Sequence, residues 1–287
     1  MPGHILLCPN PGKDVGFKYT QKAAQMLSEH GFEIKICPMT DLPLEKDVPE
    51  HVEITPVEEA LVGASLIAVF GGDGTLLRTA RAAMGRGIPI IGVNLGTMGM
   101  MAELEAGDLH KLIDAAYSRY TPVNRMMLDV ELKRDGAVVF SDFALNDAVV
   151  SGSVRLIRLT AYGDNKKIAE FSGDGIIIAT PTGSTAYSLA AGGPLVEPHS
   201  ESIILTPVCA HNPAARSFVL APDREVTIRL GDIDGKQATL SADGIDAARL
   251  ETGDTVVVRK SAHYTVTAEF GSGSFYETVY RKLGEKK

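Results

Sequence analysis

The sequence predicts an α/β domain over residues 1–121, a mainly β domain over 122–270, and a C-terminal helix over 271–287 that packs back on the α/β domain. Three observations support this prediction. Short apolar runs alternate with helical patterns in the first domain, as in a parallel sheet flanked by helices. Apolar and polar residues then alternate with the period of two of antiparallel strands. The last segment returns to a helical pattern.

The α/β domain opens with a βαβ unit. Its amphipathic helix ends at Gly31, since glycine commonly follows the last turn of a helix. In chain order, the patterns are strand 4–10, helix 16–31, strand 32–38, apolar run 58–70, helix 76–87 and strand 88–96. Repetition of strand and helix at this spacing predicts a parallel sheet with helices on its faces.

The second domain shows short alternating runs separated by turns. Asp135-Gly136 is typical of a hairpin turn. The expected strands are 128–134, 137–150, 154–163, 225–230, 238–242, 255–260 and 264–270. Residues 272–284 are expected to form the closing helix.

Composition restricts the function. The chain has 287 residues and a net charge of −8, which argues against a broad nucleic-acid surface. A polyanionic ligand must then meet backbone N–H groups or a divalent cation. The apolar runs fall well short of the roughly 18–20 residues of a membrane span, and the start does not resemble a signal peptide. Three cysteines without a C-x-x-C spacing predict neither a disulfide framework nor a zinc cluster, so we expect a cytoplasmic protein.

The stretch FGGDGTLLRTA at residues 70–80 joins an apolar run to a helical pattern. We expect its glycines to adopt positive φ in a sharp turn whose N–H groups face phosphate. Asp73 would repel phosphate unless it holds a metal or accepts a proton from an attacking hydroxyl, a combination that a kinase needs. The alternative is a tight turn in which Asp73 or Thr75 caps the helix.

A second unusual segment covers residues 172–194, SGDGIIIATPTGSTAYSLAAGGP. It places glycines and small hydroxyl residues around an apolar strand, and we expect a helix to begin at Ser184 or Thr185. Such a loop suits a polar ligand such as a nucleotide. A Ser/Thr-rich turn with a helix cap is the alternative.

Six motifs in this order resemble the ATP-dependent NAD kinase family across nearly the whole chain. TPTGSTAY is highly specific to that family, whereas GGDGT also occurs in lipid kinases. The motifs are FGGDGTLLRTAR (70–81), NLGTMG (94–99), LND (145–147), GDGIIIATPTGSTAYSLAAGGP (173–194), TPVCAH (206–211) and FYETVYRKLG (275–284).

The resemblance implies transfer of the γ-phosphoryl group of ATP, or of inorganic polyphosphate, to the 2′-hydroxyl of the adenosine ribose of NAD. Asp73 matches the proton acceptor, and Gly74 lies beside the dinucleotide. Mg²⁺ is expected to arrive on ATP, without a protein metal cage. A homo-oligomer, either dimer or tetramer, is also implied. Besides Asp73 and Gly74, the implied NAD-binding residues are Asn146, Asp147, Asp174 (nicotinamide end), Thr185, Ala186, Tyr187, Ser188, Leu189 and Ala190.

Two cations leave alternatives open. Arg155 either assists ligand binding or is an exposed strand arginine, and Lys13 either faces phosphate or, as we favour, is a solvated loop cation. Two other functions also remain: a lipid kinase of the diacylglycerol or sphingosine type, and a non-catalytic dinucleotide-binding module. Four positions depart from the family pattern and affect secondary contacts only: Met100, Ser172, Ala190 and Ile245.

Overall fold

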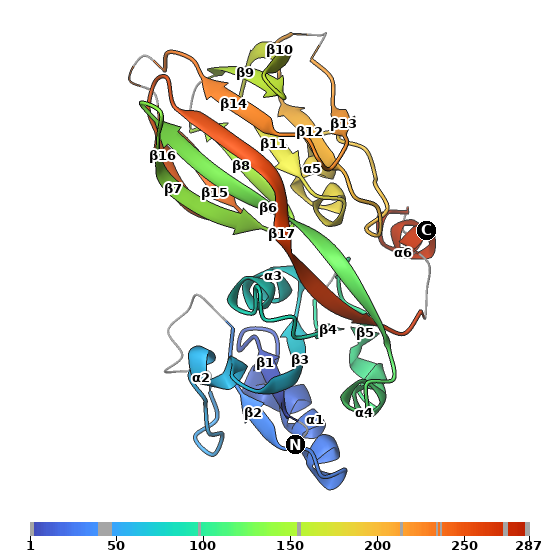
Figure 1. Cartoon of the computed structure of the whole chain (residues 1–287). Helices are drawn as coiled ribbons and strands as arrows, with labels where there is room; N and C mark the ends of the chain where they lie inside the picture. The colour runs from blue at the N-terminus through green and yellow to red at the C-terminus, as the bar shows by residue number, and fades with distance from the viewer. Residues whose placement is uncertain are drawn as a thin grey trace. The chain divides into compact units, whose positions relative to one another are not determined.

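The structure is a computed structural model that describes residues 3–39, 48–96, 99–153, 156–212, 215–233, 235, 237–271 and 275–284. The chain divides into two compact units. Unit 1 comprises Met1–Asn124 and Thr265–Lys287, and unit 2 comprises Arg125–Tyr264. The predicted fold class is confirmed, because unit 1 is an α/β structure that includes the C-terminal helix and unit 2 is mainly β (Figure 1).

Unit 1 is built on a parallel sheet with the strand order β2-β1-β3-β4. The short strand β5 continues the sheet beside β4, and Thr267, near the end of β17, pairs with Ile90 of β4. The elements are β1 (His4–Pro9), η1 (Val15–Phe17), α1 (Lys18–Glu29), β2 (Ile34–Ile36), α2 (Val57–Leu61), β3 (Ala64–Gly71), α3 (Asp73–Ala82), β4 (Ile90–Asn94), β5 (Leu104–Glu105), η3 (Ala106–Asp108), α4 (Lys111–Ala116) and α6 (Phe275–Leu283).

Helices cover both faces of this sheet, which explains why its central strands are apolar along their whole length. On one face, Leu27 of α1 and Leu112 of α4 pack in one core with alternate residues of β1, β3 and β4. On the other face, α3 lies against the sheet: the thiol of Cys8 contacts Thr79, and Leu76 packs over Gly92. The result is a three-layer α/β/α unit (Figure 1).

The parallel arrangement brings three loops to one edge of the sheet, because the carboxyl ends of parallel strands meet there. These loops follow β1 at residues 10–14, β3 at 71–74 and β4 from residue 95 onwards. Asn10 Nδ2 donates a hydrogen bond to Thr75 Oγ1 over 2.9 Å and so joins the first loop to the start of α3. This edge therefore gathers the GGDGT and NLGTMG motifs.

Unit 2 contains two antiparallel sheets that share one apolar core. One contains β10-β9-β14-β17 with β6 and β7, and the other has the order β13-β12-β11-β8-β15-β16. The elements are β6 (Thr121–Arg134), β7 (Ala137–Ala144), β8 (Asp147–Gly152), β9 (Ile157–Gly163), β10 (Lys166–Gly173), β11 (Gly175–Ala179), η4 (Thr182–Thr185), α5 (Tyr187–Ala190), β12 (Ile203–Val208), β13 (Phe218–Leu220), β14 (Val226–Leu230), β15 (Ala238–Ala242), β16 (Ile245–Leu250) and β17 (Thr255–Glu269).

The core of unit 2 is formed by alternate residues from both sheets. Val130 of β6 and Ile228 of β14 lie in the same buried cluster as Ile178 of β11 and Leu205 of β12. Burial of one face of each sheet against the other is the arrangement of a β-sandwich. The period of two in strands such as β14 and β15 reflects one buried face, whereas β11 is buried on both faces because a second apolar cluster covers its other side.

Several strands differ from the sequence-based expectation. The run 137–150 is two strands, β7 and β8, because Leu145 and Asn146 leave the ladder between them. The two expected strands 255–260 and 264–270 are one long strand, β17. Strands β10, β12, β13 and β16 were not predicted.

The helix expected from Ser184 or Thr185 was a wrong prediction. The chain instead forms the 3₁₀ turn η4 and then the single-turn helix α5, because the backbone of Ala186 between them is not helical (φ −99°, ψ −128°), and Gly192 and Gly193 follow the end of α5. Gly192 has a φ of 86°, a conformation that suits a helix end. No helix in the described residues is long and apolar enough to cross a membrane.

Candidate functional site

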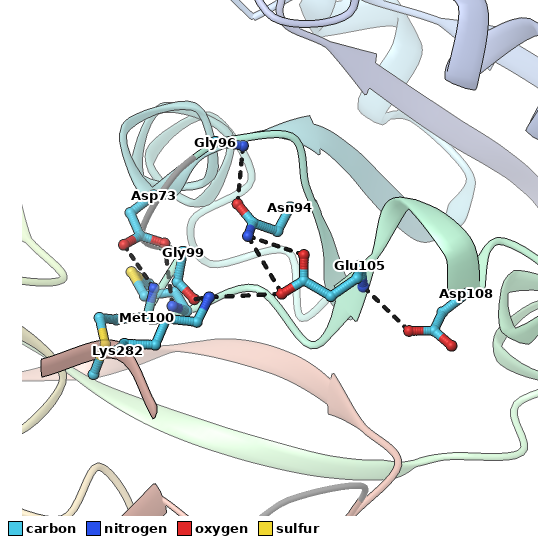
Figure 2. Close-up of polar contacts among 9 residues, drawn as sticks. Asp73, Asn94, Gly96, Gly99, Met100, Glu105, Asp108 and Lys282 are labelled. Carbon is cyan, nitrogen blue, oxygen red and sulfur yellow. Dashed lines mark hydrogen bonds and ion pairs between the residues drawn. The ribbon is translucent and has the colours of Figure 1, made fainter. Parts of the chain in front are cut away.

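Asp73 is the first residue of α3 and lies at the loop edge of the unit 1 sheet. Its Oδ2 accepts a hydrogen bond from Met100 N over 2.9 Å, and its Oδ1 accepts one from Met101 N over 3.1 Å (Figure 2). Asp73 is half-buried, and Gly74 beside it is exposed. A carboxylate has about four acceptor sites, so each oxygen keeps a lone pair for a ligand.

The glycines of the GGDGT motif differ from the expectation of positive φ, which was wrong: none of Gly71, Gly72 and Gly74 adopts it. They provide space instead. A Cβ on Gly71 would overlap the side chain of Thr75, and one on Gly72 would overlap Lys13 Nζ. A Cβ on Gly74 would meet only Arg78, at 3.9 Å, so this position leaves the backbone open to a ligand.

Lys13 lies on the β1–α1 loop, and its ammonium group approaches the glycines that follow β3 and β4. A Cβ built on Gly96 would lie 3.0 Å from Lys13 Nζ. Among the described residues its side chain has no hydrogen-bond or ion-pair partner. The favoured interpretation as a solvated loop cation is therefore incomplete, because the exposed ammonium group is held over the start of α3. A cation beside the free N–H groups of a helix N-terminus is a suitable environment for phosphate.

A series of hydrogen bonds and an ion pair among polar side chains stabilises the loop that holds Asp73 (Figure 2). Asn94 Oδ1 accepts a hydrogen bond from Gly96 N over 3.0 Å, and Asn94 Nδ2 donates one to Glu105 Oε2 over 3.1 Å. Lys282 Nζ of α6 donates to Gly99 O over 2.9 Å and lies 3.6 Å from Glu105 Oε1. The predicted return of the C-terminal helix to the α/β unit is thus made through this loop.

In unit 2, Asn146 and Asp147 lie where β7 passes into β8, and both are buried. The carboxylate of Asp243 fixes this segment. It accepts hydrogen bonds from the N–H groups of Leu145 at 2.8 Å, Asn146 at 2.7 Å and Asp147 at 3.2 Å. Asp243 and Gly244, with φ of 52° and 76°, form the two-residue turn between β15 and β16, as the sequence indicates.

The TPTGST segment joins the same cluster. Thr180 N donates to Asn146 O over 2.8 Å, and Thr180 Oγ1 donates to Leu145 O. A Cβ on Gly183 would overlap the backbone of Asn146, so this glycine allows the two segments to touch. Two buried polar atoms here, Asn146 Oδ1 and Thr182 Oγ1, have no hydrogen-bond partner among the described residues. Buried polar atoms are usually satisfied, so these two are free to accept a hydrogen bond from a water or a ligand.

Burial, and after it the neighbouring charge of Asp243, raise the pKa of Asp147 to about 7. A carboxyl group out of water favours its neutral form, and a second carboxylate nearby acts in the same direction. At neutral pH this group is therefore able to donate as well as accept a hydrogen bond.

The structure does not bring Asp174 to this cluster. Asp174 is exposed and precedes β11, whereas Thr180 follows it. Thr180 is six residues after Asp174, so at about 3.3 Å per residue of extended chain the two lie about 20 Å apart. Asp174 is instead close to Cys209: a side-chain hydrogen bond to the carboxylate, and its charge, raise the pKa of that exposed thiol.

The residues from Thr185 to Ala190 occupy η4 and α5. Tyr187 is 46% exposed, and Ala190 is also exposed. Ser188 is fully buried, with its Oγ 3.0 Å from Thr206 Oγ1, so its side chain serves the packing of α5 against β12. Thr185, Ala186 and Leu189 are half-buried, and Arg155 lies outside the described residues.

The four departures from the family pattern fall at different kinds of position. Met100 donates a hydrogen bond to Asp73 through its backbone N–H. Ser172 accepts a hydrogen bond from His211 N through its carbonyl oxygen. Ala190 and Ile245 are exposed, at the end of α5 and the start of β16.

Within the described residues, no three His, Cys, Asp or Glu side chains gather to hold a metal ion.

Comparison with known proteins matches both parts of the chain. The model of the ATP-NAD kinase N-terminal domain matches residues 5–120, and that of the ATP-NAD kinase C-terminal domain matches residues 122–270. A Ruminiclostridium cellulolyticum NAD kinase is 35% identical over 281 residues, covering 97% of this chain and 96% of the relative. A Heliobacterium modesticaldum NAD kinase is 38% identical over 260 residues, covering 85% and 91%.

Two solved structures share the fold. Yeast NADH kinase, solved in complex with NADH, superposes with a TM-score of 0.86 at 23% identity, covering 100% of this chain and 89% of that chain. An NAD kinase from Archaeoglobus fulgidus, solved in complex with ATP, gives a TM-score of 0.75 at 21% identity, covering 98% of both chains.

Proposed function

The chain belongs to the ATP-NAD kinase family and is an NAD kinase with ATP as the phosphoryl donor, and we propose that Asp73 accepts the proton of the 2′-hydroxyl of the adenosine ribose. The observation that supports this role is the placement of the Asp73 carboxylate, held through both oxygens by Met100 N and Met101 N. The relatives matched along nearly their full length are named NAD kinases, so neither a lipid kinase nor a non-catalytic module is favoured.

In the proposed reaction, the ribose oxygen attacks the γ-phosphorus of ATP while its proton passes to Asp73. The bond from that phosphorus to the bridging oxygen breaks, and ADP leaves. Catalysis of phosphoryl transfer consists mostly of positioning and charge neutralisation. Asp73 is fixed before the substrate arrives, because its two N–H partners are backbone groups.

The phosphates of ATP are proposed to bind at the first turn of α3, next to Lys13. The free N–H groups of the turn and the ammonium group favour an anion there. A Mg²⁺ ion would arrive with ATP, since Mg²⁺ is usually held by substrate phosphates and one or two carboxylates. When bound, this ion neutralises phosphate charge. Inorganic polyphosphate presents the same chemical groups as the triphosphate of ATP and is proposed as a second donor.

NAD is proposed to contact Gly74, Asn146 and Asp147 together with the 185–190 segment. The buried, unpartnered Asn146 Oδ1 and Thr182 Oγ1 support this proposal, because a bound nucleotide offers hydroxyl and amino donors to them. Asp174, about 20 Å along β11 from this cluster, and Arg155 remain proposed NAD contacts on the basis of the family resemblance. A homo-oligomer, dimeric or tetrameric, and a cytoplasmic location, where ATP and NAD are both available, complete the proposal.

The substitution Asp73→Asn tests the central role. The amide keeps the size of the side chain but accepts no proton, so we expect kcat to fall by about 10²–10⁴-fold, the usual contribution of a general base. NADP formation from ATP and NAD measures the effect, with polyphosphate as a parallel donor. The control is Asp114→Asn, an exposed acid on α4. Full turnover by the Asp73→Asn variant would rule out this role.

A further inference from the structure

Lys282, in the last turn of α6, has a nearly buried side chain. Its side chain is 9% exposed, although the helix has no buried residue, and its neighbours Tyr280 and Arg281 are exposed. Burial of a lysine is unfavourable unless its charge is satisfied. Here the ammonium group is satisfied by Gly99 O at 2.9 Å and by Glu105 at 3.6 Å.

The carbonyl group that accepts a hydrogen bond from Lys282 belongs to the same peptide group as the N–H that donates to Asp73. Gly99 C=O and Met100 N–H are parts of one planar unit, whose oxygen and hydrogen point in opposite directions. Lys282 bonds the oxygen, and Asp73 Oδ2 accepts from the hydrogen at the other end over 2.9 Å (Figure 2). One rigid peptide group therefore separates the C-terminal helix from the proposed proton acceptor.

We propose that Lys282 is a positioning residue for phosphoryl transfer, acting on Asp73 through the Gly99–Met100 peptide group. Its effect is geometric and electrostatic. A cation on the carbonyl oxygen polarises the peptide and strengthens its N–H as a donor, since linked hydrogen bonds reinforce one another. The inference rests on the proposed function, because it matters only if Asp73 takes the ribose proton.

The surrounding contacts explain why the peptide needs an external support. Gly99 has a φ of 41°, and a Cβ on it would lie 2.6 Å from Asn94 Cγ, so the chain turns sharply over that side chain. Asn94 in turn is held by Glu105. Glu105 thus contacts both Asn94 and Lys282, and fastens the loop on one side while Lys282 holds the peptide group on the other.

The test compares Lys282→Met with Arg281→Met. Both remove one positive charge from adjacent positions of α6, but only the first removes a donor to Gly99 O. For Lys282→Met we expect kcat to fall by about 10- to 100-fold, as for loss of a hydrogen bond involving a charged group, with KM for NAD and ATP changed less than about threefold. Arg281→Met is expected to leave kcat unchanged, and Lys282→Arg to restore most of it.

A second measurement separates positioning from a general loss of structure. Amide hydrogen exchange at Met100 is expected to speed up in Lys282→Met and not in Arg281→Met, while exchange in β1 and β3 stays as in the wild type. A wild-type kcat in Lys282→Met, or equal exchange at Met100 in both variants, overturns the inference. If Asp73→Asn keeps full turnover, the proposed function fails; if only Lys282→Met does, the inference alone fails.

Discussion

Replacing Asp147 by asparagine is expected to stabilise the protein at alkaline pH while weakening NAD binding. Asp147 is 5% exposed and lies near Asp243, and its pKa is raised to about 7 from an ordinary value of 3.8. At about 1.4 kcal/mol per pKa unit, keeping this carboxylate ionised in the folded protein costs about 4 kcal/mol. Asparagine keeps the size of the side chain and removes the charge.

The pH dependence follows from the direction of the shift. The folded protein retains a proton on Asp147 that the unfolded chain releases above pH 3.8, so stability falls as the pH rises from about 4 to about 7. The variant lacks this dependence. Its free energy of unfolding is therefore expected to approach that of the wild type near pH 4 and to exceed it by up to about 4 kcal/mol at pH 8.

Urea unfolding at pH 5, 6, 7 and 8 measures this difference, with the exposed acid Asp223→Asn as the control. The stabilised variant is expected to bind NAD more weakly, because strained groups at functional sites commonly lower stability in return for activity. A gap between variant and wild type that stays constant from pH 5 to pH 8, or a variant less stable than the wild type at pH 8, would refute the reasoning.

Two further substitutions test the proposed ATP contact in unit 1 and the proposed NAD contact in unit 2. Lys13→Ala is expected to raise KM for ATP by about 10- to 100-fold through loss of a charge-assisted contact to phosphate, with KM for NAD unchanged. Steady-state kinetics measures this change, with Lys18→Ala as the control. Equal KM values for ATP in these two variants would show that Lys13 does not bind the phosphoryl donor. Asp243→Asn removes one of the two carboxylate oxygens that accept from the N–H groups of Leu145, Asn146 and Asp147. The affinity for NAD, measured by calorimetry, is therefore expected to fall about tenfold. An unchanged affinity would show that this segment keeps its conformation without the carboxylate.

Much of unit 1 could be predicted from the sequence, because its elements are local patterns. The apolar runs of β1, β3 and β4 and the helical period of α1 follow directly from burial on both faces of a parallel sheet. The GGDGT motif also identified the loop edge. The prediction that its glycines adopt positive φ was wrong. Their φ values are ordinary, and the absence of a Cβ on Gly71 and Gly72 leaves room for the side chains of Thr75 and Lys13.

The contacts that build the site could not be predicted, because they join residues far apart in the chain. Asp243 lies 97 residues from Asn146, and Lys282 lies 183 residues from Gly99. In the run 137–150 only Asn146 and Asp147 interrupt the strand pattern, and the sequence does not show that the carboxylate of Asp243 holds the chain at this point. The sequence indicates a turn at Asp243-Gly244. Which N–H groups the Asp243 carboxylate contacts depends on the order of the strands in the sheet, and the hydrophobic periodicity carries no information on that order.

Because Asp73 is held by main-chain N–H groups, its hydrogen bond from residue 100 does not depend on the side chain at that position. The family pattern favours phenylalanine there, and this chain has methionine, yet the amide hydrogen that meets Asp73 is the same for either residue. Every common amino acid except proline provides that hydrogen. Substitution at this position can therefore change the side chain beside Asp73 while the hydrogen bond that holds its carboxylate is kept.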